Sequence, residues 1–230
     1  MSQILEESVY FGVTISFLAY IAGVYIKKKC KLALCNPLLI SIIFTIVLLI
    51  IFHVDYESYY AGAKYLSYLL TPATVCLAIP LYEQTALLKK NAKAIMAGIV
   101  SGVITSLLCV LGLSILFRLE HEEYVTLLPK SITTAIGMGI SEELGGYVNI
   151  SVAVIIITGV LGNMIAETVC KIFHITEPMA KGIGIGCASH AVGTAKAMEM
   201  GEVEGAMSSL SIAVAGLLTV VGSMLFAKFL

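Results

Sequence analysis

The stretch GIGIGCASHAVGTAKAMEMGEVEG, residues 182–205, lies between long apolar segments and is rich in both small and polar residues. If it is helical, His190, Gly193 and Thr194 share one face, because these positions are three and four residues apart. Hydrocarbon makes ionisable side chains costly, so they usually face a protein interior or a water-filled path. Close helix packing would explain the glycines and alanines but not the charges. The stretch therefore predicts a functional segment inside a membrane.

The composition of the chain is far more apolar than that of a soluble domain. Of its 230 residues, 59% are hydrophobic and 13% are charged. Several segments approach the roughly 20 residues that a helix needs to cross hydrocarbon. The net charge of −1 and the lone arginine, Arg118, argue against nucleic acid as a partner, and the six cysteines lack metal-ligand spacing. We therefore expect an all-α polytopic protein of the lipid bilayer, with no metal, no cofactor and no nucleic acid.

Lysine clusters set the expected topology of the first half. Lysines gather at residues 27–31 and 89–93, whereas the acidic and aromatic loop 53–60 has none. By the positive-inside rule, both clusters are cytoplasmic and the N-terminus is outside. Pro72 and Pro80 interrupt the third segment and free backbone carbonyls there. The four expected crossings are residues 9–26, 37–52, 61–82 and 94–117.

The second half contains a segment, residues 125–140, that is short for a crossing and rich in polar residues. A re-entrant path for it places Glu142 outside, the lysines of residues 171–181 inside and Glu202 outside, in agreement with the charge bias. We therefore expect about seven transmembrane helices plus a re-entrant segment, with a cytoplasmic C-terminus. The remaining crossings are then residues 149–173, 182–200 and 206–229.

Two interrupted segments resemble each other. Residues 70–84 and 186–200 are both rich in small residues, and the acidic Glu83 aligns with Glu199, 116 positions later. In the expected topology they run in opposite directions, which is typical of an inverted-repeat transporter. The alternative is two unrelated interrupted helices, which are common in membranes. The expected repeats of the single domain, residues 1–230, are approximately 9–118 and 125–230.

Two polar stretches combine hydroxyls, small residues and a basic group inside apolar sequence. A small carboxylate that enters a low-dielectric pocket must exchange its hydration for such hydrogen-bond donors. We expect the two stretches to converge on one substrate site, with His190 and Glu199 as candidates for proton coupling. The substrate-binding candidates are Lys130, Ser131, Thr133 and Thr134 in the first stretch and Ser189, His190, Thr194 and Lys196 in the second.

Each of these residues also has a structural interpretation. His190 can be a neutral histidine that bridges two helices. Lys196 and Glu199 can pair at a spacing of three residues, and Lys130 can extend to the membrane interface. Gly186 and Gly193 are expected to let a broken helix pass close to its neighbour.

Three other polar residues have expected structural roles. Glu167 and Lys171, four residues apart, are expected to form an ion pair, and Asn163 to join two helices.

The sequence contains no arrangement of serine, histidine and aspartate that indicates a nucleophile. We therefore expect no catalytic residues and no enzyme activity.

Several motifs closely resemble the LrgB family of bacterial membrane proteins. They are PKSITTAIGMGISEELGG at residues 129–146, TGVLGNM at 158–164 and GIGCASHAVGTAKAMEMGEVEGAMSSLSIAVAGLLT at 184–219, supported by TPATVCLAIPLYEQ at 71–84. The resemblance covers essentially the whole chain. It implies a bacterial inner (cytoplasmic) membrane protein that acts with a small LrgA- or CidA-like membrane partner in a homo- or hetero-oligomer.

The resemblance implies two functions. One is a transporter or channel for small monocarboxylates of the pyruvate, glycolate and glycerate class, since a plastidial glycolate/glycerate translocator contains an LrgB-like half. The alternative is a holin/antiholin-like regulator of murein hydrolase export and autolysis. Broken helices and buried polar groups favour the transporter, because a lesion-forming protein needs self-associating surfaces but no anion pocket.

Overall fold

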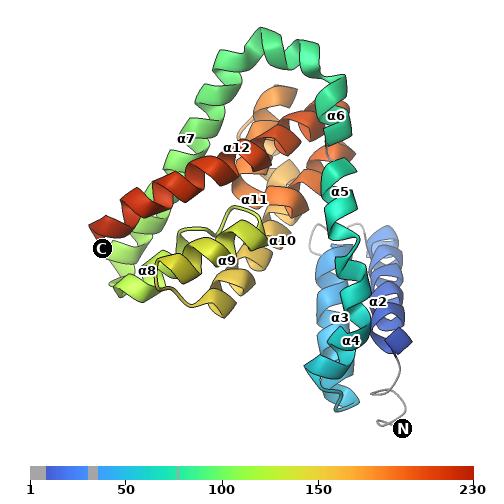
Figure 1. Cartoon of the computed structure of the whole chain (residues 1–230). Coiled ribbons are helices and arrows are strands. Elements are labelled where there is room, and N and C mark those ends of the chain that lie inside the picture. Colours follow the sequence, from blue (N-terminus) through green and yellow to red (C-terminus); the bar gives the residue numbers. More distant parts are fainter. Residues whose placement is uncertain (1–8, 31–35, 77) are drawn as a thin grey trace. The chain divides into compact units, whose positions relative to one another are not determined.

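The computed structural model describes residues 9–30, 36–76 and 78–230, and every element in them is a helix (Figure 1). This confirms the expected all-α class. The predictions for the extreme N-terminus and for Lys31 lie outside the described residues. Contacts divide the chain into two compact units, Met1–Cys76 and Leu77–Leu230, and each is described by itself. In order, the elements are α2 (Val9–Cys30), α3 (Pro37–Ile51), α4 (Tyr56–Ser67), α5 (Leu70–Cys76), α6 (Ala78–Glu83), α7 (Thr85–Phe117), α8 (His121–Leu127), α9 (Thr134–Glu143), α10 (Val148–Ile172), α11 (Pro178–Met200), α12 (Glu202–Phe226) and η1 (Ala227–Phe229).

The first unit contains α2 to α5. Gly12 lets α4 approach α2 closely, because a Cβ at Gly12 would lie 2.5 Å from the backbone nitrogen of Ala63. Asn36 caps α3, and its Oδ1 accepts a hydrogen bond from the backbone N–H of Leu38 at 2.8 Å. Such a cap satisfies one of the donors that a helix start leaves without a partner. The α2 helix is long and apolar enough to cross a membrane.

Helices begin beside both prolines of the segment 61–82. Pro72 is the third residue of α5, and Pro80 is the third residue of α6. Proline is tolerated in the first turn of a helix, where its missing N–H would have no helical partner. Since α5 belongs to the first unit and α6 to the second, the crossing by this segment stays a prediction, as do the single domain and its repeats.

The second unit is built on three long helices, α7, α10 and α12, each long and apolar enough to cross a membrane. The α7 helix bends at Asn91, where the backbone leaves helical geometry (φ −113°, ψ 17°). Beyond the bend, α7 lies beside α11 and α12 (Figure 1). The core at these contacts includes the buried side chains of Ile95, Ile99, Val103 and Leu107 of α7, Cys187 of α11, Met207 and Ala215 of α12, and Tyr124 of α8.

The α8 and α9 helices form a hairpin that enters and leaves at one end of this unit. The Tyr147 hydroxyl, at the start of α10, donates to Glu122 of α8 at 2.5 Å, and this bond raises the pKa of the phenol. The Ser151 hydroxyl lies 2.8 Å from both the Thr126 carbonyl oxygen and the Ser141 hydroxyl. Both helices are too short to cross about 30 Å of hydrocarbon. The segment therefore forms a hairpin instead of a crossing helix, which is consistent with the re-entrant path that the sequence predicts.

The α11 helix also doubles back, at Ser189 (φ −136°, ψ 15°) and His190 (φ 41°, ψ −142°). Before this turn, Gly186 lies against the backbone of Ser208 on α12. After it, the Thr194 hydroxyl lies 2.7 Å from the hydroxyl of the same Ser208. In a continuous helix, residues eight positions apart would be separated by about 12 Å along the axis. A shared neighbour therefore requires that the chain reverses.

The expected crossing by residues 182–200 is therefore wrong, and α11 is a second re-entrant hairpin. Its two ends lie together, because Lys181 is 4.0 Å from Glu204 and Met198 lies against Gly205. The α11 helix has 23 residues and is long enough to cross, but it is not among the described helices that are apolar enough to do so. What permits the reversal is α10, which supplies hydrogen-bond partners to the turn, as irregular backbone at membrane depth requires.

Because α11 reverses, α12 finishes at the opposite end of the second unit from the one expected. The Tyr124 hydroxyl of α8 donates to the carbonyl of Phe226, the last residue of α12, at 2.9 Å. Nearby, Leu107 of α7 lies against Gly222 of α12. The α7 and α12 helices therefore run in the same direction. An offset of 116 positions aligns these two helices in the expected repeats. The opposite direction expected of the repeats is not seen in this pair.

Two topological predictions are corrected as a result. The C-terminus was expected on the opposite side from Arg118, and Glu202 on the same side as Glu142. Both expectations counted α11 as a crossing. In the structure, α12 starts at the end of the unit where α10 finishes and ends beside α8.

The charges of the second unit are distributed unevenly between its two ends. We call these the lysine-rich end and the glutamate-rich end. By the positive-inside rule, the lysine-rich end is expected to be cytoplasmic. It carries Lys89, Lys90, Lys93, Lys171, Lys181 and Lys196 together with Glu167, Glu177, Glu199, Glu202 and Glu204. The glutamate-rich end carries Glu120, Glu122, Glu123, Glu142 and Glu143 with only Arg118 and Lys228 as lysine or arginine residues among those described.

Single-cysteine labelling tests this topology. In a cysteine-free background, Glu202→Cys and Lys171→Cys should react with a membrane-impermeant maleimide from one side, and Glu142→Cys and Lys228→Cys from the other. The measurement compares labelling of intact and permeabilised cells. Reaction of Glu202→Cys from the same side as Glu142→Cys would show that α11 crosses after all.

A pair of glycines on one leg of α11 tests its packing. A Cβ at Gly186 would lie 2.5 Å from the Ser208 carbonyl oxygen, whereas a Cβ at Gly184 would meet no atom within 4 Å. Gly186→Ala should therefore destabilise the protein by about 1–3 kcal/mol, and Gly184→Ala by less than about 0.5 kcal/mol. Thermal unfolding in detergent measures both, and equal losses would contradict this packing. Leucine at Gly186 or Gly193 should prevent folding.

Candidate functional site

The turn of α11 is held by α10. Only a small residue fits opposite it, because a Cβ at Gly159 would lie 2.7 Å from His190 Nε2. The same Nε2 is 3.0 Å from the Ile155 carbonyl oxygen, and since a carbonyl only accepts, Nε2 carries the hydrogen. The Asn163 side chain donates to the carbonyl of Val192 at 2.7 Å. The expected role of Asn163 in joining two helices is confirmed.

The second leg of α11 is fixed to α12 by hydroxyls. Thr194 Oγ1 donates to the carbonyl of His190 at 3.0 Å and also contacts Ser208 Oγ. Gly193 gives this leg room, because a Cβ there would lie 2.5 Å from the Cβ of Ser189. Ser189, His190 and Thr194 are all buried. These side chains therefore brace the hairpin against its neighbours.

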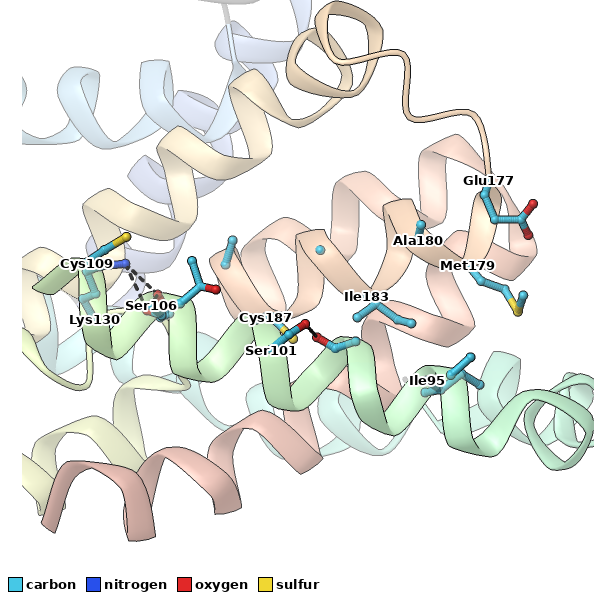
Figure 2. A pocket seen from close by; sticks show the side chains of 17 residues that line it. Ile95, Ser101, Ser106, Cys109, Lys130, Glu177, Met179, Ala180, Ile183 and Cys187 are labelled. Carbon is cyan, nitrogen blue, oxygen red and sulfur yellow. Dashed lines mark hydrogen bonds between the residues drawn. The ribbon is translucent and has the colours of Figure 1, made fainter. Parts of the chain in front are cut away.

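A cavity of about 630 Å³ lies between α7 and the first leg of α11 (Figure 2). It extends from Ala94 and the exposed Glu177, at the lysine-rich end, to Cys109 and Lys130. Much of its wall is apolar or small, and the hydroxyls lie mainly on α7. The hydroxyl, thiol and amino groups on the wall include those of Ser101, Thr105, Ser106, Cys109, Lys130 and Ser131.

Lys130 lies at the inner end of this cavity, in the turn between α8 and α9. Its Nζ donates to Ser131 Oγ at 2.8 Å and lies 3.5 Å from Ser106 Oγ of α7 (Figure 2). Within residues 9–30, 36–76 and 78–230, no ion pair joins Lys130 to a carboxylate. An ammonium in such surroundings attracts an anion, because its hydration is reduced and no protein charge compensates it.

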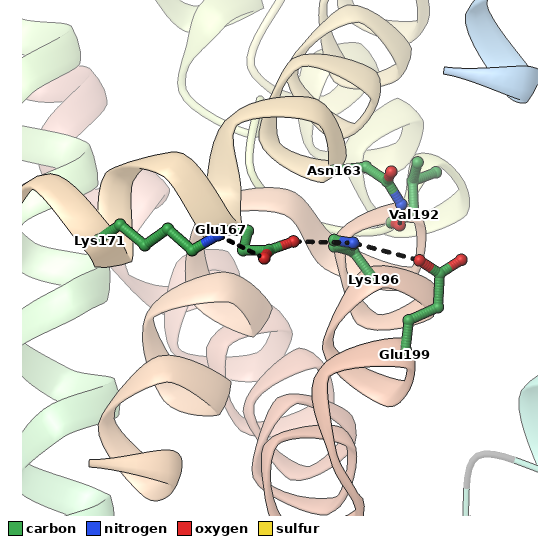
Figure 3. A network of polar contacts seen from close by, with 6 residues as sticks. All are labelled: Asn163, Glu167, Lys171, Val192, Lys196 and Glu199. Atoms are coloured by element: carbon green, nitrogen blue, oxygen red, sulfur yellow. Dashed lines mark hydrogen bonds and ion pairs between the residues drawn. The ribbon is translucent and has the colours of Figure 1, made fainter. Parts of the chain in front are cut away.

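A chain of ion pairs joins α10 to the second leg of α11 (Figure 3). Glu167 accepts from Lys171 at 2.9 Å and pairs with Lys196 at 3.3 Å, and Lys196 also pairs with Glu199 at 3.2 Å. The predicted pairs of Glu167 with Lys171 and of Lys196 with Glu199 are confirmed. These residues line a second cavity of about 530 Å³ at the lysine-rich end. Lys196 therefore already has two carboxylate partners.

The structure thus distributes the predicted site residues over several places. Lys130 and Ser131 line the first cavity, together with Cys187 and Ala188 from the second polar stretch. His190 itself faces α10 and is not part of the cavity wall. The others lie elsewhere: Thr133 and Thr134, half-buried, begin α9; Ser189 and Thr194 brace the hairpin; Lys196 and Glu199 form ion pairs.

The polar face of α7 was not anticipated from the sequence. Ser101, Thr105 and Cys109 recur every four residues in an otherwise apolar helix, and this spacing places them on one face. Gly98 and Gly102 on the same helix let Ile183 and Cys187 of α11 approach. This periodicity was the signal that could have identified the cavity wall.

As to metals, the described ranges contain no group of three or more His, Cys, Asp or Glu residues able to hold one.

Comparison with known proteins gives a consistent family. The model of the LrgB-like family matches residues 16–229. A protein named antiholin-like protein LrgB from Bacillus cereus (strain B4264) is 37% identical over 222 residues, which is 96% of each chain. The protein of the same name from Bacillus anthracis (strain CDC 684 / NRRL 3495) gives the same values. No solved structure gives a significant match. With this identity, this coverage and an all-helical fold that contains membrane-length helices, the chain belongs to the LrgB-like family.

Proposed function

We propose that this protein carries small monocarboxylates across the bacterial cell membrane, together with an LrgA- or CidA-like partner. The observation that supports this most directly is Lys130, an ammonium without a carboxylate partner in the described residues, at the inner end of a cavity. A hydrogen bond to a charged group contributes about 1.5–3 kcal/mol. One cation surrounded by hydroxyls suits an anion with one carboxylate, and the small apolar wall suits a short carbon chain.

The position of Lys130 fits a carrier. The cavity runs from the lysine-rich end to Lys130, and beyond Lys130 the side chains of Val125, Leu128 and Pro129 in the first hairpin are buried. In this carrier, an anion would reach Lys130 from the lysine-rich end. Movement of a hairpin would expose it to the other side, as alternating access requires. Coupling to protons through His190 or Glu199 stays a prediction, and both side chains already have partners.

The names of the relatives support a second candidate function. Both are called antiholin-like, so a role in the control of autolysis is proposed for this chain as the alternative. Such a role needs no anion site. The two candidates are therefore distinguished by whether Lys130 is needed.

Uptake of labelled pyruvate or glycolate into proteoliposomes, with and without the partner, tests the transporter. Lys130→Met should lower the uptake efficiency about 10- to 100-fold, because it removes a charged hydrogen bond. Lys130→Arg should not restore it, since a planar guanidinium does not replace a compact ammonium in a small site. Lys171→Met is the matched control, because this lysine is exposed and lies in the ion-pair chain, and it should change uptake less than twofold.

Two results would count against the transporter. One is equal uptake by Lys130→Met and the unaltered protein. The other is an absence of uptake of either acid with the partner present, while autolysis control in cells is retained by Lys130→Met. The second result would favour the antiholin-like role.

A further inference from the structure

Three polar groups from two separate elements meet at the inner end of the cavity. Lys130 Nζ lies 2.8 Å from Ser131 Oγ and 3.5 Å from Ser106 Oγ, and the two hydroxyl oxygens are 3.2 Å apart. Ser106 belongs to α7, whereas Lys130 and Ser131 belong to the turn between α8 and α9 (Figure 2). The contacts therefore close a triangle that joins the tip of the first hairpin to a long helix.

The Ser106 hydroxyl is directed away from its own helix. A serine inside a helix often donates to a carbonyl of the preceding turn, and Ser101 does so, with its Oγ 2.8 Å from the Gly98 carbonyl oxygen. Within the described residues of α7, Ser106 makes no such bond, and its contacts are with Ser131 and Lys130. Two serines five residues apart on one cavity wall thus differ in what their hydroxyls bind.

Counting donors shows what the triangle can bind. An ammonium has three N–H donors, and each hydroxyl has one O–H donor. Lys130 directs one N–H to Ser131 and one, over a long contact, to Ser106, while the two hydroxyls share one hydrogen. At least one N–H and one O–H then have no partner inside the triangle. Two donors of this kind match the two oxygens of one carboxylate.

We propose that Ser106 is a binding and positioning residue of the anion site. With Lys130 and Ser131 it forms a binding site for one carboxylate group. This inference rests on the proposed function, because it completes the same site. Ser106 holds the ammonium against α7, and it supplies the hydroxyl donor that complements the ammonium. The long contact between Lys130 and Ser106 is weak, so an entering carboxylate can replace it at little cost.

Uptake kinetics give the first test. In proteoliposomes with the partner, Ser106→Ala should raise the KM for pyruvate about tenfold, because a bond to a charged ligand is lost, and should change the maximal rate less than about twofold. Ser106→Thr keeps a hydroxyl and should stay within about threefold of the unaltered KM. Ser101→Ala, on the same wall, should leave the KM unchanged, because its hydroxyl is already bonded within α7.

Binding is measured separately through Cys109, an exposed thiol that lines the same end of the cavity. With the other five cysteines replaced, bound pyruvate should slow the reaction of Cys109 with a small thiol reagent. The pyruvate concentration that gives half of this protection should rise about tenfold in Ser106→Ala and stay unchanged in Ser101→Ala. This readout requires no transport.

The possible results distinguish the role of Ser106 in binding from the proposed transport function. An unchanged KM and unchanged protection in Ser106→Ala would overturn the role of Ser106 while leaving the transporter intact. Equal losses in Ser101→Ala and Ser106→Ala would overturn it too, since any hydroxyl on the wall would then serve. If pyruvate protects Cys109 in a Ser106-dependent way but the protein transports neither pyruvate nor glycolate, the carboxylate site is supported and the transport function is refuted.

Discussion

The arrangement of the second unit depends on hydrogen bonds and close contacts between the turn of α11 and α10. Backbone that leaves helical geometry at membrane depth must find partners inside the protein. Gly159 makes space for the turn, Ile155 accepts from His190, and the Asn163 side chain donates to the carbonyl of Val192. With the turn anchored in this way, the first leg of α11 is placed against α7, and the cavity wall exists because of it.

The two hairpins enter from opposite ends and share a residue of α10. The Ile155 side chain lies against Gly137 of α9, while its carbonyl binds His190 at the turn of α11. Lys130, in the turn of the first hairpin, reaches Ser106 near the middle of α7. Both hairpins therefore bring polar residues between the long helices of the unit. This placement, rather than a single broken crossing helix, generates the candidate site.

Local patterns predicted much of this architecture but not the path of α11. Composition gave the all-α membrane class, short polar helices gave the first hairpin, and spacing gave the pair of Glu167 with Lys171. The reversal at Ser189 and His190 was missed because a break in a helix looks the same in sequence whether the chain continues or returns. Whether the chain continues or returns is decided by α10, where Gly159 leaves room for the turn and Ile155 and Asn163 form hydrogen bonds with it. For the same reason, His190 was placed in the anion site, although in the structure it faces α10.

The lysines of the second unit differ in whether a carboxylate lies beside them. Lys171 and Lys196 share Glu167, and Lys181 lies 4.0 Å from Glu204, all at the lysine-rich end. The exposed pair of Lys171 with Glu167 contributes little to stability. Lys130 lies deeper and, within the described ranges, is near hydroxyls instead of carboxylates. Hydroxyls orient an ammonium without neutralising it, so its positive charge stays available to an entering anion. A carboxylate in the same place would neutralise the ammonium and remove the basis of the proposed anion site.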